Sequence, residues 1–133
     1  MKRAIASDRA PKAVGPYSQA VAFGDLLFCA GQIPLDPETG EITGADVAAQ
    51  TERVIENIKA VLNVNAMTLE DVVKTTVFLT TMEDFAAMNA VYARHFSEPF
   101  PARSTVAVVA LPRGAKVEIE VTAAKAAING SSE

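Results

Sequence analysis

The stretch that decides the fold is Val73-Lys74-Thr75-Thr76-Val77-Phe78-Leu79, followed almost at once by Thr81-Met82-Glu83-Asp84. The first segment is rich in β-branched residues and predicts a strand. The second predicts the start of a helix, because a threonine can cap the first turn and the helix dipole favours acidic residues there. This helix is expected to run to about Phe96, since Pro99 and Pro101 prevent its continuation. Its inward residues are expected to be Phe85, Met88, Tyr92 and Phe96.

Upstream of this strand, the chain predicts a hairpin and a first helix. Ala20–Phe23 and Leu26–Ala30 are apolar segments separated by Gly24-Asp25, which is typical of a two-residue hairpin turn. A helix is expected from about Asp46 to Asn63, because its apolar residues form a stripe along one face. The stripe consists of Val47, Val54, Ile55, Ile58, Val61 and Leu62.

Downstream, two further strands are expected near Ser104–Ala110 and Lys116–Ala126, and another N-terminal strand at Ile5. The order is then strand, strand, helix, strand, helix, strand, strand. This order predicts an α+β fold in which a mixed sheet of about six strands carries two helices on one face. Residues 1–133 are expected to form one domain, with a frayed tail at residues 129–133.

The second face of this sheet is predicted to need a cover. Two helices can cover only one face, yet the strand segments are apolar on both, most plainly at Val106–Leu111 and Leu26–Ala30. No third helix is available to shield them. A partner subunit is the expected cover.

The composition limits the classes of function. Half of the 133 residues are hydrophobic and 21% are charged, so the chain is globular. A net charge of −4 with scattered basic residues argues against nucleic acid as the main partner. No apolar run is long enough to predict a membrane span, and the N-terminus does not resemble a signal peptide. A single cysteine fits the cytosol and a cytoplasmic location.

Two charged residues near the C-terminus are the main candidates for chemistry. Arg103 opens a strand that is expected to be largely buried, so its guanidinium needs a carboxylate or an anion supplied by a ligand. Glu118 lies on the next strand and could move protons. An anion receptor beside such a carboxylate would suit a small organic acid. A purely structural Arg103–Glu118 pair is the alternative, and these two residues alone do not decide between them.

Other polar residues are open to simpler interpretations. The loops at Gly15–Ser18 and Gly31–Pro34 could present N–H groups to an anion or be ordinary turns. Cys29 is expected to be inert core, and His95 to lie at the surface or near a helix end. Asn89 is expected to form a structural hydrogen bond. The sequence contains no nucleotide-binding glycine motif and no metal-ligand spacing, so no cofactor or metal is expected.

Five motifs in order resemble the Rid family, also called YjgF, of 2-iminobutanoate/2-iminopropanoate deaminases. The motifs are Gly15–Ala20, Ala30–Pro34, Val73–Phe78, Pro101–Ser104 and Val117–Glu120. The resemblance extends from about Ile5 to Ala127. It implies a fold like that of the small trimeric chorismate mutases and a homotrimer with clefts between subunits.

The resemblance also implies roles for individual residues. Arg103 matches the arginine that binds the substrate carboxylate, and Glu118 matches the glutamate that handles water and the proton. Tyr17 matches the tyrosine at the mouth of the cleft, Gly31 the backbone donor, and Asn89 an asparagine near the site. The chain departs from the family at Ala30, where serine is common, and at Thr105, where cysteine is common. Both departures concern substrate preference more than activity.

The expected activity is cofactor-free hydrolysis of reactive 2-imino acids to 2-keto acids and ammonia. Such imines arise from pyridoxal-phosphate dehydratases and can damage other pyridoxal enzymes, so the role would be metabolite damage control. Two alternatives stay open: a regulatory module that binds 2-keto acids without turnover, and a structural or holdase-like trimer. Ammonia release from a generated imine separates the first possibility from the other two.

Overall fold

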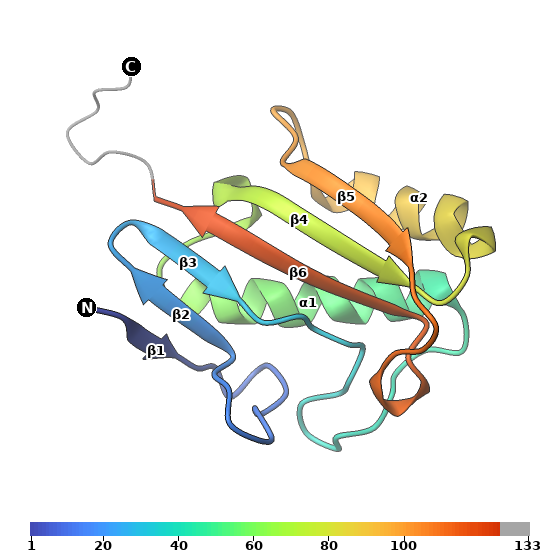
Figure 1. Ribbon diagram of the computed structural model, residues 1–133, viewed down its shortest axis with the longest axis horizontal. Helices are drawn as coiled ribbons and strands as arrows, with labels where there is room; N and C mark the ends of the chain where they lie inside the picture. Colours follow the sequence, from blue (N-terminus) through green and yellow to red (C-terminus); the bar gives the residue numbers. More distant parts are fainter. Residues whose placement is uncertain (126–133) are drawn as a thin grey trace.

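The fold is built from six strands and two main helices (Figure 1). The computed structural model describes residues 1–125. The strands are β1 (Arg3–Ile5), β2 (Ala20–Phe23), β3 (Leu26–Cys29), β4 (Val72–Leu79), β5 (Ala102–Ala107) and β6 (Val117–Ala124), and the helices are α1 (Val47–Val64) and α2 (Phe85–His95). The predicted tail at residues 129–133 lies outside the described residues.

All six strands form one mixed sheet in the order β1-β2-β3-β6-β4-β5. Every neighbouring pair is antiparallel except β4 and β5, which run parallel because α2 carries the chain back between them. The last strand of the sequence, β6, is therefore inserted between β3 and β4 near the middle of the sheet. The predicted fold class is confirmed, including the additional strand at Ile5.

The first helix forms where its local signals predict it. Asp46 caps α1 by accepting a hydrogen bond from the Ala49 N–H at 2.9 Å, and the whole predicted apolar stripe is buried against the sheet. On α2, Met88 and Tyr92 are buried, and Phe96 is buried just beyond the helix, whereas Phe85 is only partly buried. Within residues 1–125, neither helix combines the length and apolarity needed to traverse a bilayer.

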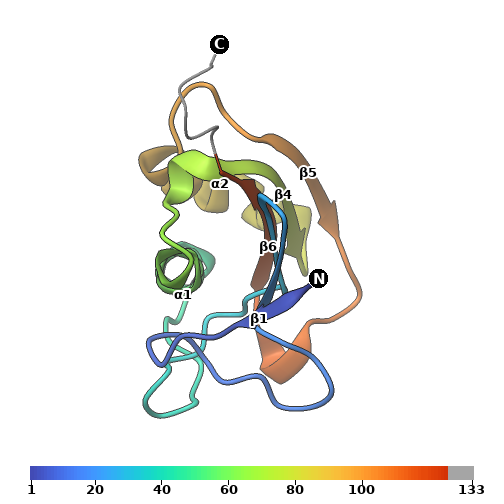
Figure 2. The same cartoon turned by 90° about the vertical axis from the view of Figure 1, so that its left-hand side faces the viewer.

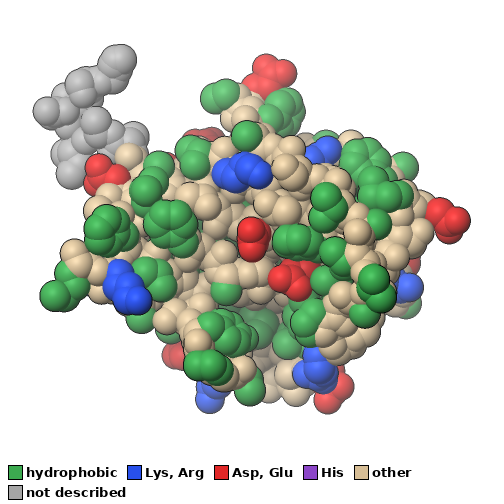
Figure 3. Space-filling view, in the orientation of Figure 1, with side chains coloured by type: hydrophobic (Ala, Val, Ile, Leu, Met, Phe, Trp, Pro, Cys, Tyr) green, Lys and Arg blue, Asp and Glu red, His purple; other side chains and the backbone are tan. Residues whose placement is uncertain are grey.

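Both helices lie on the same face of the sheet, as Figure 2 shows. The opposite face carries exposed apolar side chains, such as Phe23 at 56% and Phe28 at 47% exposure. Figure 3 views this open face, where green side chains surround acidic groups near the centre. The prediction that the second face of the sheet is apolar and uncovered within one chain is confirmed.

The predicted burial of the strand that begins near Arg103 is wrong for the single chain. This strand, β5, ends at Ala107 instead of Ala110, and it lies at the sheet edge with β4 as its one neighbour. Its apolar residues are therefore poorly covered, and Val106 is 42% exposed. After Ala107, the Val108 N–H still donates to the Leu79 carbonyl at 2.7 Å, and the chain then leaves the sheet.

Candidate functional site

Arg103 lies on β5 with its side chain directed towards α2. Its Nη1 donates a hydrogen bond to Oδ1 of Asn89 at 2.7 Å. Its guanidinium carbon lies 4.7 Å from the ring centre of Tyr92 and 5.6 Å from that of Phe85. Within residues 1–125, no carboxylate forms an ion pair with Arg103. The guanidinium is thus a partly buried cation that is held by neutral groups.

The Tyr92 ring that contacts Arg103 has two further contacts, with Thr75 and with Phe96. The Tyr92 hydroxyl and the Thr75 hydroxyl form a buried hydrogen bond of 2.9 Å. Burial raises the pKa of Tyr92, while the Thr75 hydrogen bond and the charge of Arg103 act in the opposite direction. Phe96 stacks on the Tyr92 ring with 4.2 Å between centroids. The tyrosine beside the guanidinium is therefore hydrogen-bonded at its hydroxyl and stacked on a second aromatic ring.

Thr105 lies two residues beyond Arg103 on β5, so both side chains are on the helix-facing side of the sheet. Its Oγ1 is buried and has no hydrogen-bond partner among the described residues. A buried hydroxyl without a partner is uncommon, because its desolvation is not compensated. We call Arg103, Asn89 and Thr105 the arginine half-site.

Glu118 lies on the open face of the sheet, where it pairs in register with Phe78 of β4. The alternation along β6 buries Val117 and Ile119 under the helices and leaves Glu118 and Glu120 on the other face. Burial raises the pKa of Glu118, and the nearby charge of Glu120 raises it further. A carboxyl group with a raised pKa is suited to proton transfer near neutral pH.

Gly31 packs directly against Glu118. A Cβ atom at Gly31 would overlap the Glu118 carboxylate, with only 2.8 Å to its carboxyl carbon. The contact is maintained by Gln32, whose N–H donates to the Ile119 carbonyl at 2.8 Å and whose carbonyl accepts from Ile119 N–H at 3.1 Å. With no Cβ, Gly31 leaves room for the Glu118 carboxylate to lie against the backbone. We call Glu118 and Gly31 the glutamate half-site.

Ala30 directly precedes Gly31, and a backbone hydrogen bond links it to Gln19, two residues beyond Tyr17. The Ala30 N–H donates to the Gln19 carbonyl at 2.9 Å, so this N–H already has an acceptor within the chain. The same bond brings the end of the Tyr17 loop next to Gly31. Tyr17 is exposed, and its hydroxyl accepts a hydrogen bond from Val14 N–H at 3.3 Å. The buried Gln19 side chain anchors this loop through bonds to Ser7 and Pro11.

The two half-sites lie on opposite faces of the sheet. Arg103 is in register with Thr75, and Glu118 is in register with Phe78, three residues further along β4. Because side chains alternate along a strand, residues an odd number of positions apart face opposite ways. The hypothesis of an Arg103–Glu118 pair within one chain is therefore wrong.

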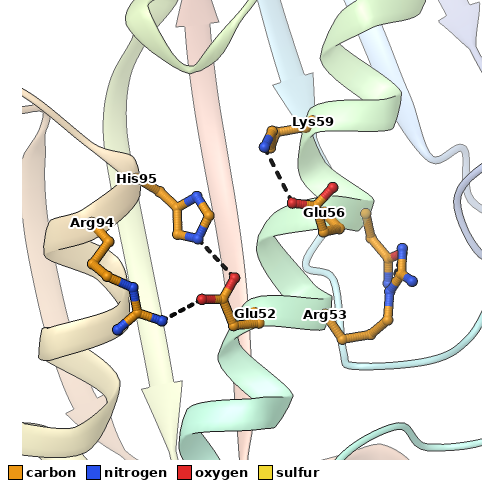
Figure 4. Close-up of polar contacts among 7 residues, drawn as sticks. Glu52, Arg53, Glu56, Lys59, Arg94 and His95 are labelled. Carbon is orange, nitrogen blue, oxygen red and sulfur yellow. Dashed lines mark hydrogen bonds and ion pairs between the residues drawn. The ribbon is translucent and has the colours of Figure 1, made fainter.

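The remaining candidates play no part in either half-site. Cys29 is buried in the core, and burial raises the pKa of its thiol to about 12, which fits the prediction of an inert residue. His95 is the last residue of α2, as predicted near a helix end. Its Nε2 lies 2.8 Å from Oε1 of Glu52, and Arg94 pairs with the same carboxylate (Figure 4). This contact links α1 to α2.

A cavity of about 680 Å³ lies near these charged residues, away from both half-sites. Its lining includes Arg53, Glu56, Lys59 and Asn63 of α1 and Arg94 and His95 of α2. Figure 4 shows that much of this charge is already paired, with Glu56 bound to Lys59 and Glu52 bound to Arg94. None of the predicted site residues contributes to this cavity.

The sequence reasoning assigned Tyr92 and Phe85 to the core and missed their contact with Arg103. A signal was available in the spacing of Phe85, Asn89 and Tyr92, which places all three on one side of α2. What the spacing could not show was that β5 lies beside this helix face. That neighbourhood depends on the parallel pairing of β4 and β5.

Comparisons with known proteins identify relatives along most of the chain. The family model described as endoribonuclease L-PSP matches residues 7–125. A RutC family protein of Pyrococcus horikoshii is 53% identical over 125 residues, covering 94% of this chain and 99% of the relative. The 2-iminobutanoate/2-iminopropanoate deaminase of Escherichia coli K12 is 45% identical over 128 residues, covering 94% and 99%. The crystal structure of E. coli TdcF with bound serine superposes with a TM-score of 0.88 at 43% identity, covering 93% and 99%.

Proposed function

Because the chain belongs to the endoribonuclease L-PSP family, also called the YjgF or Rid family, we propose that it is an imine deaminase. It would hydrolyse 2-imino acids such as 2-iminobutanoate and 2-iminopropanoate to 2-keto acids and ammonia. The observation that carries this proposal is Arg103, a partly buried cation without a carboxylate partner among residues 1–125. Such a guanidinium is suited to the carboxylate of a small organic acid.

The complete site would lie between two copies of the chain. Arg103 and Glu118 cannot reach one small ligand from opposite faces of one sheet, so a single chain supplies only half of the machinery. Arg103 lies on the edge strand, and the open face that carries Glu118 exposes apolar side chains such as Phe28. A homotrimer that covers this face would bring the arginine half-site of one copy to the glutamate half-site of the next.

The proposed reaction uses these groups in separate roles. Arg103 would bind the carboxylate and present the imine carbon in one orientation. Glu118 would accept a proton from water as the water oxygen bonds to that carbon, and would pass the proton to nitrogen. The resulting carbinolamine would then collapse, with its hydroxyl proton transferred to the departing amine to release ammonia and the 2-keto acid. Gly31 leaves room for the Glu118 carboxylate and could donate its N–H to the ligand.

The substrate class is supported by the relatives and by the charge of the chain. One E. coli relative is named for 2-iminobutanoate and 2-iminopropanoate, and another was solved with serine, which carries a carboxylate. A net charge of −4 does not favour RNA as a substrate, although the family model is described as an endoribonuclease. We place the enzyme in the cytoplasm, where pyridoxal enzymes would generate its substrates.

The test is to generate imines in place from several amino acids and to follow ammonia release with and without the protein. Accelerated release that saturates with imine concentration supports the deaminase. Tight binding of 2-ketobutanoate without acceleration would instead identify a regulatory binding module, and neither binding nor turnover would favour a structural trimer. Comparing several amino acids also determines which imino acid is preferred, to which Ala30 and Thr105 are expected to contribute.

A further inference from the structure

We propose that Tyr92 is a positioning residue that holds the Arg103 guanidinium in place for a carboxylate. In this proposal the Thr75 hydroxyl fixes the tyrosine through a hydrogen bond to its hydroxyl. The kinetic part of this inference rests on the proposed function. The geometric part rests on contacts within the chain: 4.7 Å from the guanidinium carbon to the ring centre and 2.9 Å between the two hydroxyls. Neither Tyr92 nor Thr75 is expected to touch the substrate.

The first step is that Arg103 needs external support. An arginine side chain has several rotatable bonds, and fixing it costs conformational entropy at the moment a ligand binds. No carboxylate holds Arg103 within residues 1–125. The Tyr92 ring can take this role without neutralising the charge, because a guanidinium stacks favourably on an aromatic face.

The second step is that the Tyr92 ring is itself fixed. Thr75 is fully buried and Tyr92 is nearly so, and each hydroxyl satisfies the other. Thr75 is also the register partner of Arg103 across the β4–β5 pair. The guanidinium, the ring and the threonine therefore form a closed connection from β5 through α2 to β4, which restricts movement of any one of them.

The third step concerns which edge of the guanidinium stays free. Asn89 Oδ1 accepts a hydrogen bond from Arg103 Nη1, and this bond restricts rotation of the guanidinium within its own plane. Among the described residues, no acceptor forms a hydrogen bond with Nε or Nη2 of Arg103. A carboxylate can therefore bind in bidentate fashion along the Nε–Nη2 edge while the ring supports one face. This arrangement favours a ligand that presents one planar carboxylate.

The experiment compares Tyr92→Leu, Tyr92→Phe and the wild type as purified full-length oligomers. The probe is 2-ketobutanoate, titrated by calorimetry, and the NMR signal of the Arg103 Nε–H reports the position of the guanidinium. Loss of the ring in Tyr92→Leu is expected to weaken binding about 5- to 30-fold and to shift that NMR signal. Tyr92→Phe keeps the ring and loses only the anchor, so it should recover most of the binding, within about 2- to 5-fold of the wild type.

Two controls separate positioning from general damage to the fold. Met88→Ala removes a fully buried side chain from the same helix and should lower stability while leaving 2-ketobutanoate binding near the wild-type value. Combining Tyr92→Leu with Arg103→Met, which removes the cation, should weaken binding no further than Arg103→Met alone, because Tyr92 acts through Arg103. An additive loss in that double variant would overturn the inference, as would unchanged binding in Tyr92→Leu.

Failure of the proposed function would look different. If the wild type does not hydrolyse imines, the calorimetric and NMR comparison still tests the support of Arg103, because it needs only carboxylate binding. If the wild type binds no 2-keto acid, benzoate and acetate serve as carboxylate probes in the same comparison. A wild type that binds none of these carboxylates would overturn the inference that the Arg103 guanidinium is held ready for one. Where imine turnover is present, Tyr92→Leu should raise KM more than it lowers kcat, and an effect on kcat alone would contradict positioning for binding.

Discussion

Arg103 and Glu118 lie on opposite faces of the same sheet, in register with Thr75 and Phe78 of β4 respectively. If both residues act on one substrate, each active site must take its arginine from one copy and its glutamate from another. Two inactive variants, Arg103→Lys and Glu118→Gln, should therefore restore activity when their chains are mixed. Random assembly of equal amounts into trimers would leave about a quarter of the sites intact.

The measurement is imine hydrolysis after the two variants are unfolded together and refolded. The separately refolded variants, mixed without exchange, are the matched control and should stay inactive. Sedimentation should show trimers in every sample. Mixed trimers without recovered activity would mean that both residues of a site come from one chain, and a stable monomer would contradict any site shared between copies.

Glu118→Gln should keep the fold and 2-keto-acid binding while losing most turnover. Glutamine matches the shape of the side chain but cannot exchange the proton, and general acid–base roles contribute about 10²–10⁴-fold. Single-turnover kinetics and calorimetry measure the two properties separately. Glu120→Gln on the same face is the control: it should keep most of the activity, and it should move the limb of the pH–rate profile that Glu118 controls to lower pH. Loss of activity in Glu120→Gln alone would reverse the assignment.

The raised pKa of Glu118 predicts how stability depends on pH. Burial, and then the charge of Glu120, disfavours the ionised form in the folded chain, so the folded state holds this proton to higher pH than the unfolded state. The contribution of the bound Glu118 proton to the free energy of unfolding is fully present below the ordinary carboxyl pKa. It is lost as the pH rises through the raised pKa of Glu118. Glu118→Gln should therefore gain more free energy of unfolding over the wild type at pH 7 than at pH 4. Denaturant titrations at both pH values measure this difference, and an equal effect at both would contradict the raised pKa.

Gly31→Ala should inactivate the protein through Glu118 without preventing folding. The new methyl group would overlap the end of a flexible carboxylate side chain, so Glu118 can move away at modest cost but leaves its position beside Gly31. The expected result is a large loss of turnover with a small change in Tm. The double variant Gly31→Ala with Glu118→Gln should be no less active than Glu118→Gln alone. A further loss in the double variant would give Gly31 a role independent of Glu118.

The elements that the sequence predicted best are those with local signals. The bounds of α1 are within about one residue of the prediction because Asp46 caps the helix and its apolar stripe is continuous. The extent of β5 was overestimated, because the apolar run Val106–Leu111 shows strand propensity but not the position of the strand at a sheet edge. Propensity describes a residue, whereas an edge position depends on which strands pair.

The two charged candidates, Arg103 and Glu118, could be picked out from the sequence, but their placement on opposite faces of the sheet could not. Arg103 and Glu118 are recognisable as a cation and a carboxylate on neighbouring predicted strands. Their opposite orientation follows from the insertion of β6 between β3 and β4 and from the registers of both pairings with β4. These are non-local contacts that no short motif records. The contact between Arg103 and Tyr92 was missed for the same reason.

Arg103→Lys should lose far more activity than stability. Arg103 has no carboxylate partner within residues 1–125, so its replacement leaves no buried anion behind, and lysine keeps the positive charge over the Tyr92 ring. Lysine cannot form a planar two-point contact with a carboxylate, which should cost about 2–5 kcal/mol of transition-state binding. Thermal unfolding and imine hydrolysis on the same preparation test the two expectations.

Arg94→Lys, at an exposed ion pair with Glu52, makes the same chemical change elsewhere and should affect neither measurement strongly. A destabilised Arg103→Lys protein that still turns over imines at the wild-type rate would remove Arg103 from the active site.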